Sequence, residues 1–303
     1  MADLHANPDA KQSSQPLVGI VWMLVTSALF VTVTASVKHG AAELPAAMSA
    51  FVRYFLGLVF FIPIFPRLFQ LRLTRQQVQF VAIRGATHSL GVILWFFAMT
   101  RISIAEVTSM GYMTPVYVTL AAALFLGEKL AIRRLAAIFV AFIGALVILR
   151  PGLRELSDGH IAMIFSAGFF AISYLTAKKL ADELPASVVV ALLSVTVTIG
   201  LFPFALAVWR WPTAEELGWL CLIAVVATAG HYSMTRAFAV APVSVTQPVT
   251  FTQLVWSVLV GYFMFSEAID IWVILGGTLI LLAATFIAIR EAMLQRAKPD
   301  LTL

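Results

Sequence analysis

The sequence predicts an all-α integral membrane protein with ten transmembrane helices, arranged as two inverted five-helix repeats. Three observations support this fold class: the composition, the series of long apolar stretches and an internal repeat. Of the 303 residues, 61% are hydrophobic and 12% are charged, and the mean hydropathy is +0.96. Soluble proteins are about half apolar and about a quarter charged. A chain this poor in charge is expected to cover its apolar surface with lipid.

Ten apolar stretches follow one another along the chain, and about 20 apolar residues are enough for a helix to cross a bilayer. In the first half they are predicted at 17–37, 47–66, 80–99, 105–126 and 135–149. In the second half they are predicted at 161–177, 187–207, 217–238, 243–265 and 271–289. Runs of this length without polar alternation favour helices over the strands of a membrane barrel.

An internal repeat relates the two halves. Residues 27–46 (SALFVTVTASVKHGAAELPA) recur as 166–186 (SAGFFAISYLTAKKLADELPA), with Lys38 aligned on Lys178, and 98–128 align without gaps on 237–267. Since each half has an odd number of spans, the second half must enter the membrane in the opposite sense. The predicted organisation is a tail at 1–16, a first repeat at 17–150, a second repeat at 151–290 and a tail at 291–303.

The charge distribution indicates the topology. Lys and Arg are more frequent on the side that carries both tails, so both termini are predicted to be cytoplasmic. The net charge of +5 then reflects topology and lipid headgroups and gives no reason to invoke nucleic acid. The first sixteen residues lack the pattern of a cleaved signal. Cys221, the one cysteine, lies in the eighth span and is interpreted as a packing residue.

Several local motifs recur at equivalent places in the two halves. An ELPA segment follows the first and the sixth span, Arg53 lies within FVRYF of the second span, and the fourth and ninth spans end in LFLGE and FMFSE. Together these features resemble the EamA-type transporters of the drug/metabolite transporter superfamily over about residues 17–290. The resemblance implies a cavity between the halves, lined mainly by the third, fourth, eighth and ninth spans and by parts of the first, second, sixth and seventh. It leaves the substrate open, because the superfamily moves amino acids, nucleosides, sugars, polyamines, vitamins and S-adenosylmethionine.

Candidate substrate-binding residues are the polar and aromatic side chains inside the predicted spans. A charge at the centre of a bilayer costs about 3 kcal/mol on insertion scales, so such a group needs a partner or water. The predicted cavity residues are Arg53, His88, Trp95, Glu106, Tyr112, Tyr117, His231, Gln247, Gln253 and Trp256.

Each of the titratable candidates has a simpler interpretation as well. Arg53 either faces the cavity or a buried partner, or it extends toward the membrane surface. Glu106 either binds substrate or a proton, or it stabilises the positive end of a helix dipole. His88 and His231 either contact substrate or carry a proton, or they form ordinary interhelical hydrogen bonds. Arg84 is interpreted as an anchor at the cytoplasmic interface.

The fourth and ninth spans hold most of the other candidates. Their alignment pairs Tyr117 with Trp256, and Pro115 and Pro248 are predicted to interrupt the two helices and free carbonyl groups at membrane depth. The alternative is ordinary helix packing through Ser and Thr side chains. Glu128 and Glu267, at the ends of these spans, are interpreted as helix-terminus residues with structural roles.

The sequence lacks the signatures of several other classes of protein. The first and sixth spans contain no acidic residue, which disfavours a proton-coupled exporter of cationic drugs. The sequence shows no P-loop, no GxSxG and no metal-spaced His/Cys cluster, so neither an enzyme, a metal site nor a cofactor is predicted. A membrane scaffold would not need matched polar positions in the two repeats.

The sequence therefore predicts a secondary transporter or facilitator of a small organic metabolite in a bacterial-type inner membrane. Many aromatic side chains and few acids suit a flat heterocycle, neutral or mildly anionic, with uptake of riboflavin as the leading example. Export or import of amino-acid metabolites or of S-adenosylmethionine is the alternative. The expected partners are a small-molecule substrate and the lipid bilayer, and ten helices need no oligomer to form a pathway.

Overall fold

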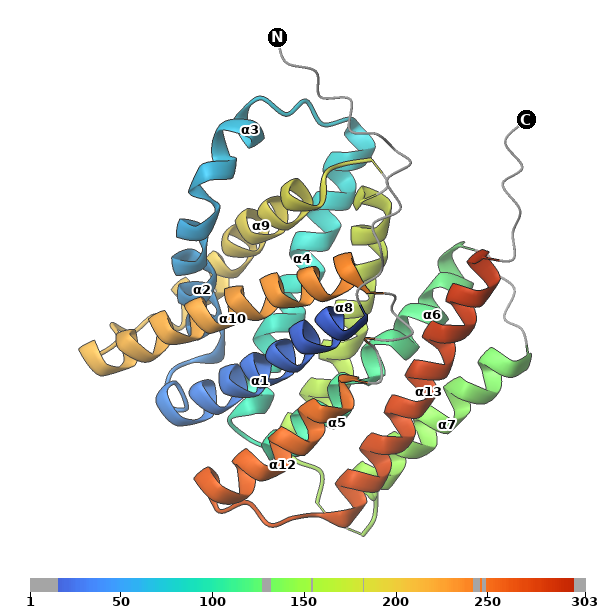
Figure 1. Ribbon diagram of the computed structural model, residues 1–303. Helices are drawn as coiled ribbons and strands as arrows, with labels where there is room; N and C mark the ends of the chain where they lie inside the picture. Colours follow the sequence, from blue (N-terminus) through green and yellow to red (C-terminus); the bar gives the residue numbers. More distant parts are fainter. Residues whose placement is uncertain are drawn as a thin grey trace.

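The computed structural model describes residues 16–126, 132–153, 155–181, 183–241, 246 and 249–296, and all its regular elements there are helices (Figure 1). The first half contains α1 (Pro16–Gly40), α2 (Ala46–Gly57), the 3₁₀ helix η1 (Leu58–Ile64), α3 (Phe65–Phe69), α4 (Arg75–Met99), α5 (Ile104–Gly111), α6 (Met113–Leu126) and α7 (Ile132–Leu149). The second half contains α8 (Asp158–Ala181), α9 (Ala186–Ala207), α10 (Ala214–Val240), α12 (Phe251–Phe265) and α13 (Ile271–Arg296).

Seven helical segments of the described chain are long and apolar enough to cross a membrane. They are Leu17–Gly40, Ala46–Ile64, Arg75–Met99, Asp158–Ala177, Ser187–Ala207, Ala214–Met234 and Ile271–Arg290, and two shorter apolar helices cover Leu135–Leu149 and Thr252–Phe265. Large apolar side chains point outward from these helices, for example Phe139, Ile199 and Phe263, which are 66%, 66% and 75% exposed. Such surfaces are rare on soluble monomers. The chain is a multi-pass, all-helical membrane protein.

The fourth predicted span, 105–126, is interrupted, as the prolines indicated. The helix divides into α5 and α6 at Tyr112, and Pro115 lies in the first turn of α6. In a first turn the missing N–H of proline removes no intrahelical hydrogen bond. The equivalent Pro248 lies outside the described residues.

The two halves are interleaved. Helix α1 packs along α10, α4 along α8 and α7 along α13, and each pair takes one helix from each half (Figure 1). The α1–α10 pair is antiparallel, because Gly19 lies against Ala241 and Gly40 against Trp219. The α7–α13 pair is antiparallel as well, because Gly144 lies against Ile280 and Gly276 against Ile148.

Two glycines set the separation of α7 and α13. A Cβ atom added to Gly144 would lie 2.7 Å from the carbonyl oxygen of Gly276, and one added to Gly276 would lie 2.5 Å from the carbonyl oxygen of Gly144. Any larger side chain would push the backbones apart. Small residues at a helix crossing are a common device in membranes, where close backbone contact replaces the hydrophobic effect.

Equivalent helices of the two halves also begin in the same way. Helix α4 starts with a capping box of Thr74 and Gln77, and α10 starts with a capping box of Thr213 and Glu216. Helices α2 and α9 both follow a proline, Pro45 and Pro185. The local structure at these helix starts therefore follows the repeat that the sequence shows.

Candidate functional site

A group of cationic and aromatic side chains, some buried and some exposed, gathers on α2, α4, α8 and α10. We call it the cationic cluster, and it comprises Arg53, Tyr54, Arg84, His88, Phe170, Tyr174 and His231. Arg53, Arg84 and His88 are buried, with 6%, 7% and 5% exposure. His88 lies near enough to Arg53, Arg84 and His231 to interact with each of them electrostatically.

Arg53 is the least compensated charge of the cluster. Its guanidinium carbon lies 4.1 Å from the ring centroid of Tyr54, and the described residues provide it with no hydrogen bond or ion pair. A desolvated cation–π contact is worth about 2 kcal/mol, whereas insertion of an arginine at the centre of a membrane costs about 3 kcal/mol. The Tyr54 ring therefore offsets only part of this cost, and N–H donors of Arg53 remain for another group.

The surroundings of Arg84 differ from the interfacial anchor that the sequence predicted. A snorkelling anchor would be exposed, yet the Arg84 side chain is buried and donates from Nη1 to the carbonyl oxygen of Val189 on α9 over 3.2 Å. Its Nε is buried and has no partner among the described residues. Burial arises because α4 packs against both α8 and α9 along its length, which the sequence alone does not reveal.

His88 is held by two side chains. Its Nε2 lies 3.0 Å from the hydroxyl of Tyr54, and its Nδ1 lies 3.1 Å from the hydroxyl of Ser173 on α8. The ring also packs against Phe170 at 4.9 Å. His88 thus makes the interhelical hydrogen bonds of the simpler interpretation, and it makes them beside Arg53 and His231.

Aromatic side chains give the cluster an accessible face. Tyr174 is 46% exposed and is stacked on Phe170, with 6.3 Å between ring centroids. His231 is exposed and packs edge-on against Phe30 of α1 at 5.2 Å. Trp95 of α4 meets Phe170 edge-on at 6.5 Å. The buried cations are therefore flanked by rings that are partly exposed.

No carboxylate enters this region from the described part of the chain. There, Asp and Glu residues occupy connecting segments or the first three positions of a helix, apart from Glu291 near the end of α13. The same residues include no group of three His, Cys, Asp or Glu side chains placed to hold a metal ion. The charge of the cluster is therefore positive.

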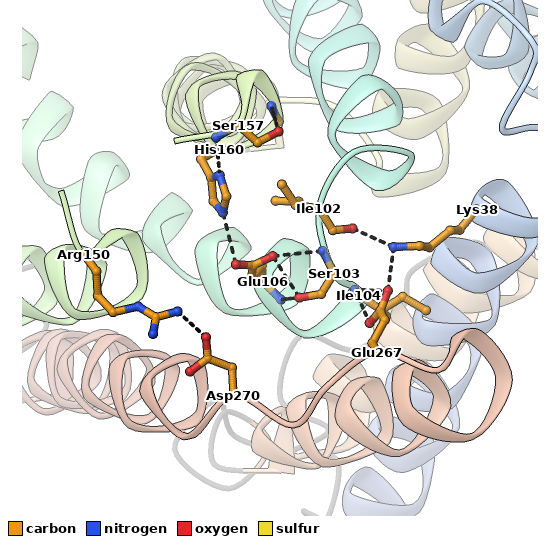
Figure 2. A network of polar contacts seen from close by, with 11 residues as sticks. Lys38, Ile102, Ser103, Ile104, Glu106, Arg150, Ser157, His160, Glu267 and Asp270 are labelled. Atoms are coloured by element: carbon orange, nitrogen blue, oxygen red, sulfur yellow. Dashed lines mark hydrogen bonds and ion pairs between the residues drawn. The ribbon is translucent and has the colours of Figure 1, made fainter. Parts of the chain in front are cut away.

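A second polar group lies at one end of the bundle (Figure 2). We call it the end network, and it comprises Lys38, Ile102, Ser103, Ile104, Glu106, Arg150, Ser157, His160, Glu267 and Asp270. Lys38 Nζ lies 2.5 Å from Glu267 Oε1 and donates to the carbonyl oxygen of Ile102 over 2.8 Å. Glu267 Oε2 also accepts the backbone N–H of Ile104 over 3.0 Å.

Glu106 belongs to this end network. It forms a capping box with Ser103 at the start of α5, and its Oε1 lies 3.1 Å from Nε2 of His160 (Figure 2). Because His160 Nδ1 accepts the backbone N–H of Ser157 over 3.2 Å, the ring proton resides on Nε2 and is donated to Glu106. The contacts of Glu106 are thus those of the helix-terminus interpretation. Sequence analysis did not select His160, although it is a histidine placed directly before an apolar span.

The end network joins the two halves of the chain. Lys38–Glu267, Glu106–His160 and Arg150–Asp270 each pair a residue of the first half with one of the second. Glu267 does lie beyond the end of α12, as the sequence indicated, and Ser266 before it has a positive φ of 53°. The reach of Glu267 to α1 and α5 depends on tertiary packing.

The interrupted helices meet at their breaks. Tyr112, at the end of α5, donates its hydroxyl hydrogen to the carbonyl oxygen of Thr250, which precedes α12, over 2.9 Å. Thr108 and Ser257 are joined by a hydroxyl hydrogen bond of 2.6 Å. A carbonyl near the start of α12 is thereby paired within the membrane, as an apolar surrounding requires.

The remaining predicted residues are dispersed. Tyr117 packs against Phe142 of α7 at 6.2 Å, whereas Trp256 is 45% exposed on α12, so the aligned pair sits on helices with different neighbours. Gln253 is half-buried on α12, and Gln247 lies outside the described residues. Cys221, interpreted as a packing residue, is exposed on α10.

Comparison with known proteins agrees with this architecture. The family model of the EamA-like transporter family matches the chain twice, over residues 17–150 and 157–289. A crystal structure of a protein with 18% sequence identity superposes with a TM-score of 0.54 and covers 91% of this chain and 97% of that one.

Named relatives are transporters of different compounds. A riboflavin transporter of Vibrio cholerae is 28% identical, with 94% of this chain and 98% of the relative covered. A pseudopaline exporter of Pseudomonas aeruginosa is 28% identical, with 88% and 94% covered. An S-adenosylmethionine uptake transporter of Rickettsia prowazekii is 24% identical, with 94% and 97% covered.

The duplicated match spans nearly the whole described bundle, and these relatives align over most of their own length. The duplicated family match and the named relatives show that the chain is a transporter of small molecules and not an enzyme. The chain belongs to the EamA-like transporter family of the drug/metabolite transporter superfamily.

Proposed function

We propose that the chain is a secondary transporter or facilitator that takes up a flat heterocyclic metabolite, and that riboflavin is the first compound to test. The observation that carries this proposal is the cationic cluster, where buried Arg53 and His88 are flanked by the accessible rings of Tyr174 and His231. Rings of this kind stack on a heterocycle, while N–H and O–H groups pair with its polar edges.

The proposed topology has ten spans in two inverted repeats, with both termini in the cytoplasm of a bacterial inner-membrane protein. The antiparallel α7–α13 contact supports this topology, because α7 is the last helix of the first half and α13 is the last helix of the second half. In an inverted repeat, equivalent helices cross the membrane in opposite directions. The end network then lies on the side away from the cytoplasm, since α1 begins near the cytoplasmic terminus and carries Lys38 in its last turn.

The proposed transport cycle alternates between two open states. In this cycle, the contacts of Lys38, Glu106 and Arg150 with the second half hold the outer end of the bundle closed. Outward opening would separate these pairs, and inward opening would keep them. Because the described spans contain few titratable groups, the proposed process is facilitated uptake, and proton coupling through Glu106 or a histidine is the alternative that an imposed proton gradient tests.

Transport of amino-acid metabolites or S-adenosylmethionine is a second candidate. Relatives named as a pseudopaline exporter and as an S-adenosylmethionine uptake transporter favour it, and Arg53 offers N–H donors that suit the carboxylate of an amino acid. The two candidates differ in the compound that is expected to bind at the cationic cluster.

The test measures uptake by proteoliposomes that contain the full chain. Riboflavin, S-adenosylmethionine and a panel of amino acids are offered with and without an imposed proton gradient. We expect selective entry of riboflavin at a rate that the gradient leaves unchanged. Entry of another compound alone would show that riboflavin is not the substrate. Absence of any entry or exit would contradict the uptake proposal.

Two variants connect transport to the cluster. Tyr174→Ala removes an accessible ring of the cationic cluster, and base–aromatic stacking is worth about 1–3 kcal/mol, so we expect about a tenfold or larger fall in uptake. Phe263→Ala is the matched control, because Phe263 is 75% exposed on α12 and carries no contact of the cluster. Equal losses in both variants at equal membrane levels would contradict the assigned binding face.

A further inference from the structure

We infer that the cationic cluster binds an anionic group of the substrate, a carboxylate or a phosphate attached to an aromatic ring, and that Arg53 makes the contact. This inference rests on the proposed transport function and refines its substrate class: among flat heterocycles, an organic anion should bind more tightly than a neutral compound such as riboflavin.

The first argument is the chemistry of Arg53. A guanidinium stays protonated in proteins, so Arg53 carries its charge even though it is 6% exposed. The Tyr54 ring covers one face of it, at 4.1 Å, and leaves the N–H groups at its edge free of any partner in the described chain. Two parallel N–H groups match the paired oxygens of a carboxylate or phosphate.

The second argument is the field around Arg53. Arg84 and the two histidines lie close to the same place, and the described carboxylates stand at helix ends. Arg84 itself retains an unpaired buried Nε. Without a ligand, the charges of Arg53 and Arg84 therefore share a region of low dielectric constant with no carboxylate of the described chain beside them, and an anion is the partner that compensates them.

The third argument is the shape of the accessible face. Phe170 and Tyr174 stack with an interplanar angle of 14°, and Tyr174 is 46% exposed. Tyr174 also lies near enough to Arg84 to interact with it electrostatically, so a planar ring stacked on Tyr174 would bind near a buried guanidinium. The combination of a stacking face and a cationic edge fits an aromatic anion better than an aliphatic anion or a neutral ring.

The experiment compares anions with their neutral counterparts on the purified full chain in detergent. The probes are nicotinate against nicotinamide, which tests a carboxylate, and riboflavin 5′-phosphate against riboflavin, which tests a phosphate. Affinity is taken from the ligand-dependent rise of the unfolding temperature. We expect the anion of at least one pair to bind about tenfold more tightly or better, as a charge-assisted hydrogen bond provides.

Substitutions assign the effect to Arg53. We expect Arg53→Gln to abolish the preference for the anion. The matched control is Arg101→Gln, because Arg101 also lies over a ring, 3.9 Å from Phe97, but is exposed in the connection after α4. Without ligand, Arg53→Gln should unfold at the same or a higher temperature, since it removes an uncompensated charge. If Arg53→Gln does not fold, Arg53→Lys keeps the charge without the planar fork, and it should reduce the preference.

Each outcome bears on the inference. Tighter binding of the neutral member of both pairs, binding of neither member, or an anion preference that survives Arg53→Gln would overturn it. Riboflavin uptake by the proteoliposomes together with preferred binding of neutral riboflavin would leave the proposed function standing and remove only the anion site. If no compound is taken up but an anion binds tightly, the proposed uptake function is wrong and the anion site at the cationic cluster stands.

Discussion

At the scale of single residues, the buried polar side chains divide into those with complete partners and those without. Glu106 and His160 satisfy each other and are further fixed by Ser103 and Ser157. Arg53 and Arg84 keep unused donors inside the membrane. Paired buried groups stabilise a fold, whereas unpaired ones lower its stability and mark places where a ligand binds.

The Glu106–His160 pair allows a prediction about stability. His160→Ala removes one hydrogen-bond donor from the buried Glu106 carboxylate, which is expected to cost about 1–3 kcal/mol of unfolding free energy. Glu106→Gln should cost less, because its single amide oxygen still accepts from either His160 or the backbone N–H of Ser103, although not from both. Unfolding in mixed micelles measures both.

Glu216→Gln is the control for that comparison, since Glu216 forms a similar capping box at the exposed start of α10. A smaller loss in His160→Ala than in Glu216→Gln would show that the histidine contributes no buried hydrogen bond.

At the scale of helices, close approach and interruption decide the packing. Gly144 and Gly276 bring α7 and α13 together, and Tyr112 joins the break between α5 and α6 to the start of α12. The glycines need no unusual backbone angle here, so it is the absence of a side chain that matters.

Glycine substitutions should therefore have opposite effects at two helical sites. Gly276→Ala places a Cβ 2.5 Å from a carbonyl oxygen of α7, and the forced separation is expected to cost about 1–3 kcal/mol. Gly168→Ala on α8 meets no atom within 4 Å and should stabilise by about 0.5–1 kcal/mol through helix propensity. Thermal unfolding of the two variants checks the signs, and a stabilised Gly276→Ala would contradict the packing at this crossing.

At the scale of the whole molecule, the end network fastens one half of the chain to the other. Its three pairs connect the ends of α1 and α7 and the start of α5 with α8 and with the segment between α12 and α13. Exposed ion pairs contribute little to stability, about 0–1 kcal/mol each. A part-buried network that must break on opening nevertheless favours the closed state over the open one.

Reversal of the Lys38–Glu267 charges tests this closure. Lys38→Glu or Glu267→Lys alone should open the outer end, and the double exchange should restore the closure in part, because it re-forms the ion pair but not the bonds to the Ile102 carbonyl and the Ile104 N–H. The measurement is labelling of Tyr174→Cys, in a Cys221→Ala background, by an impermeant thiol reagent outside right-side-out vesicles. Glu216→Lys is the control, because it breaks the Arg210–Glu216 pair within the second half. Unchanged labelling in both single variants would contradict a closing role.

The sequence by itself determined the membrane class, the repeat, the family and most helix positions. These properties depend on local composition and on similarity along the chain, and the prolines even indicated the break in 105–126. The sequence also pointed to Arg53, His88 and His231 as unusual residues at membrane depth. It supplied these because a charged or titratable group in an apolar run is visible without any knowledge of its neighbours.

Only the tertiary structure decided which of these residues meet. It buried Arg84, paired Glu106 with His160, linked Lys38 to Glu267, and separated Tyr117 from the helix that carries Trp256. Helices from the two halves interleave, so contacts form between residues more than a hundred positions apart in the chain. The position of a residue within an apolar stretch indicates how deep it lies in the membrane. The neighbours that its side chain meets depend on how the helices pack.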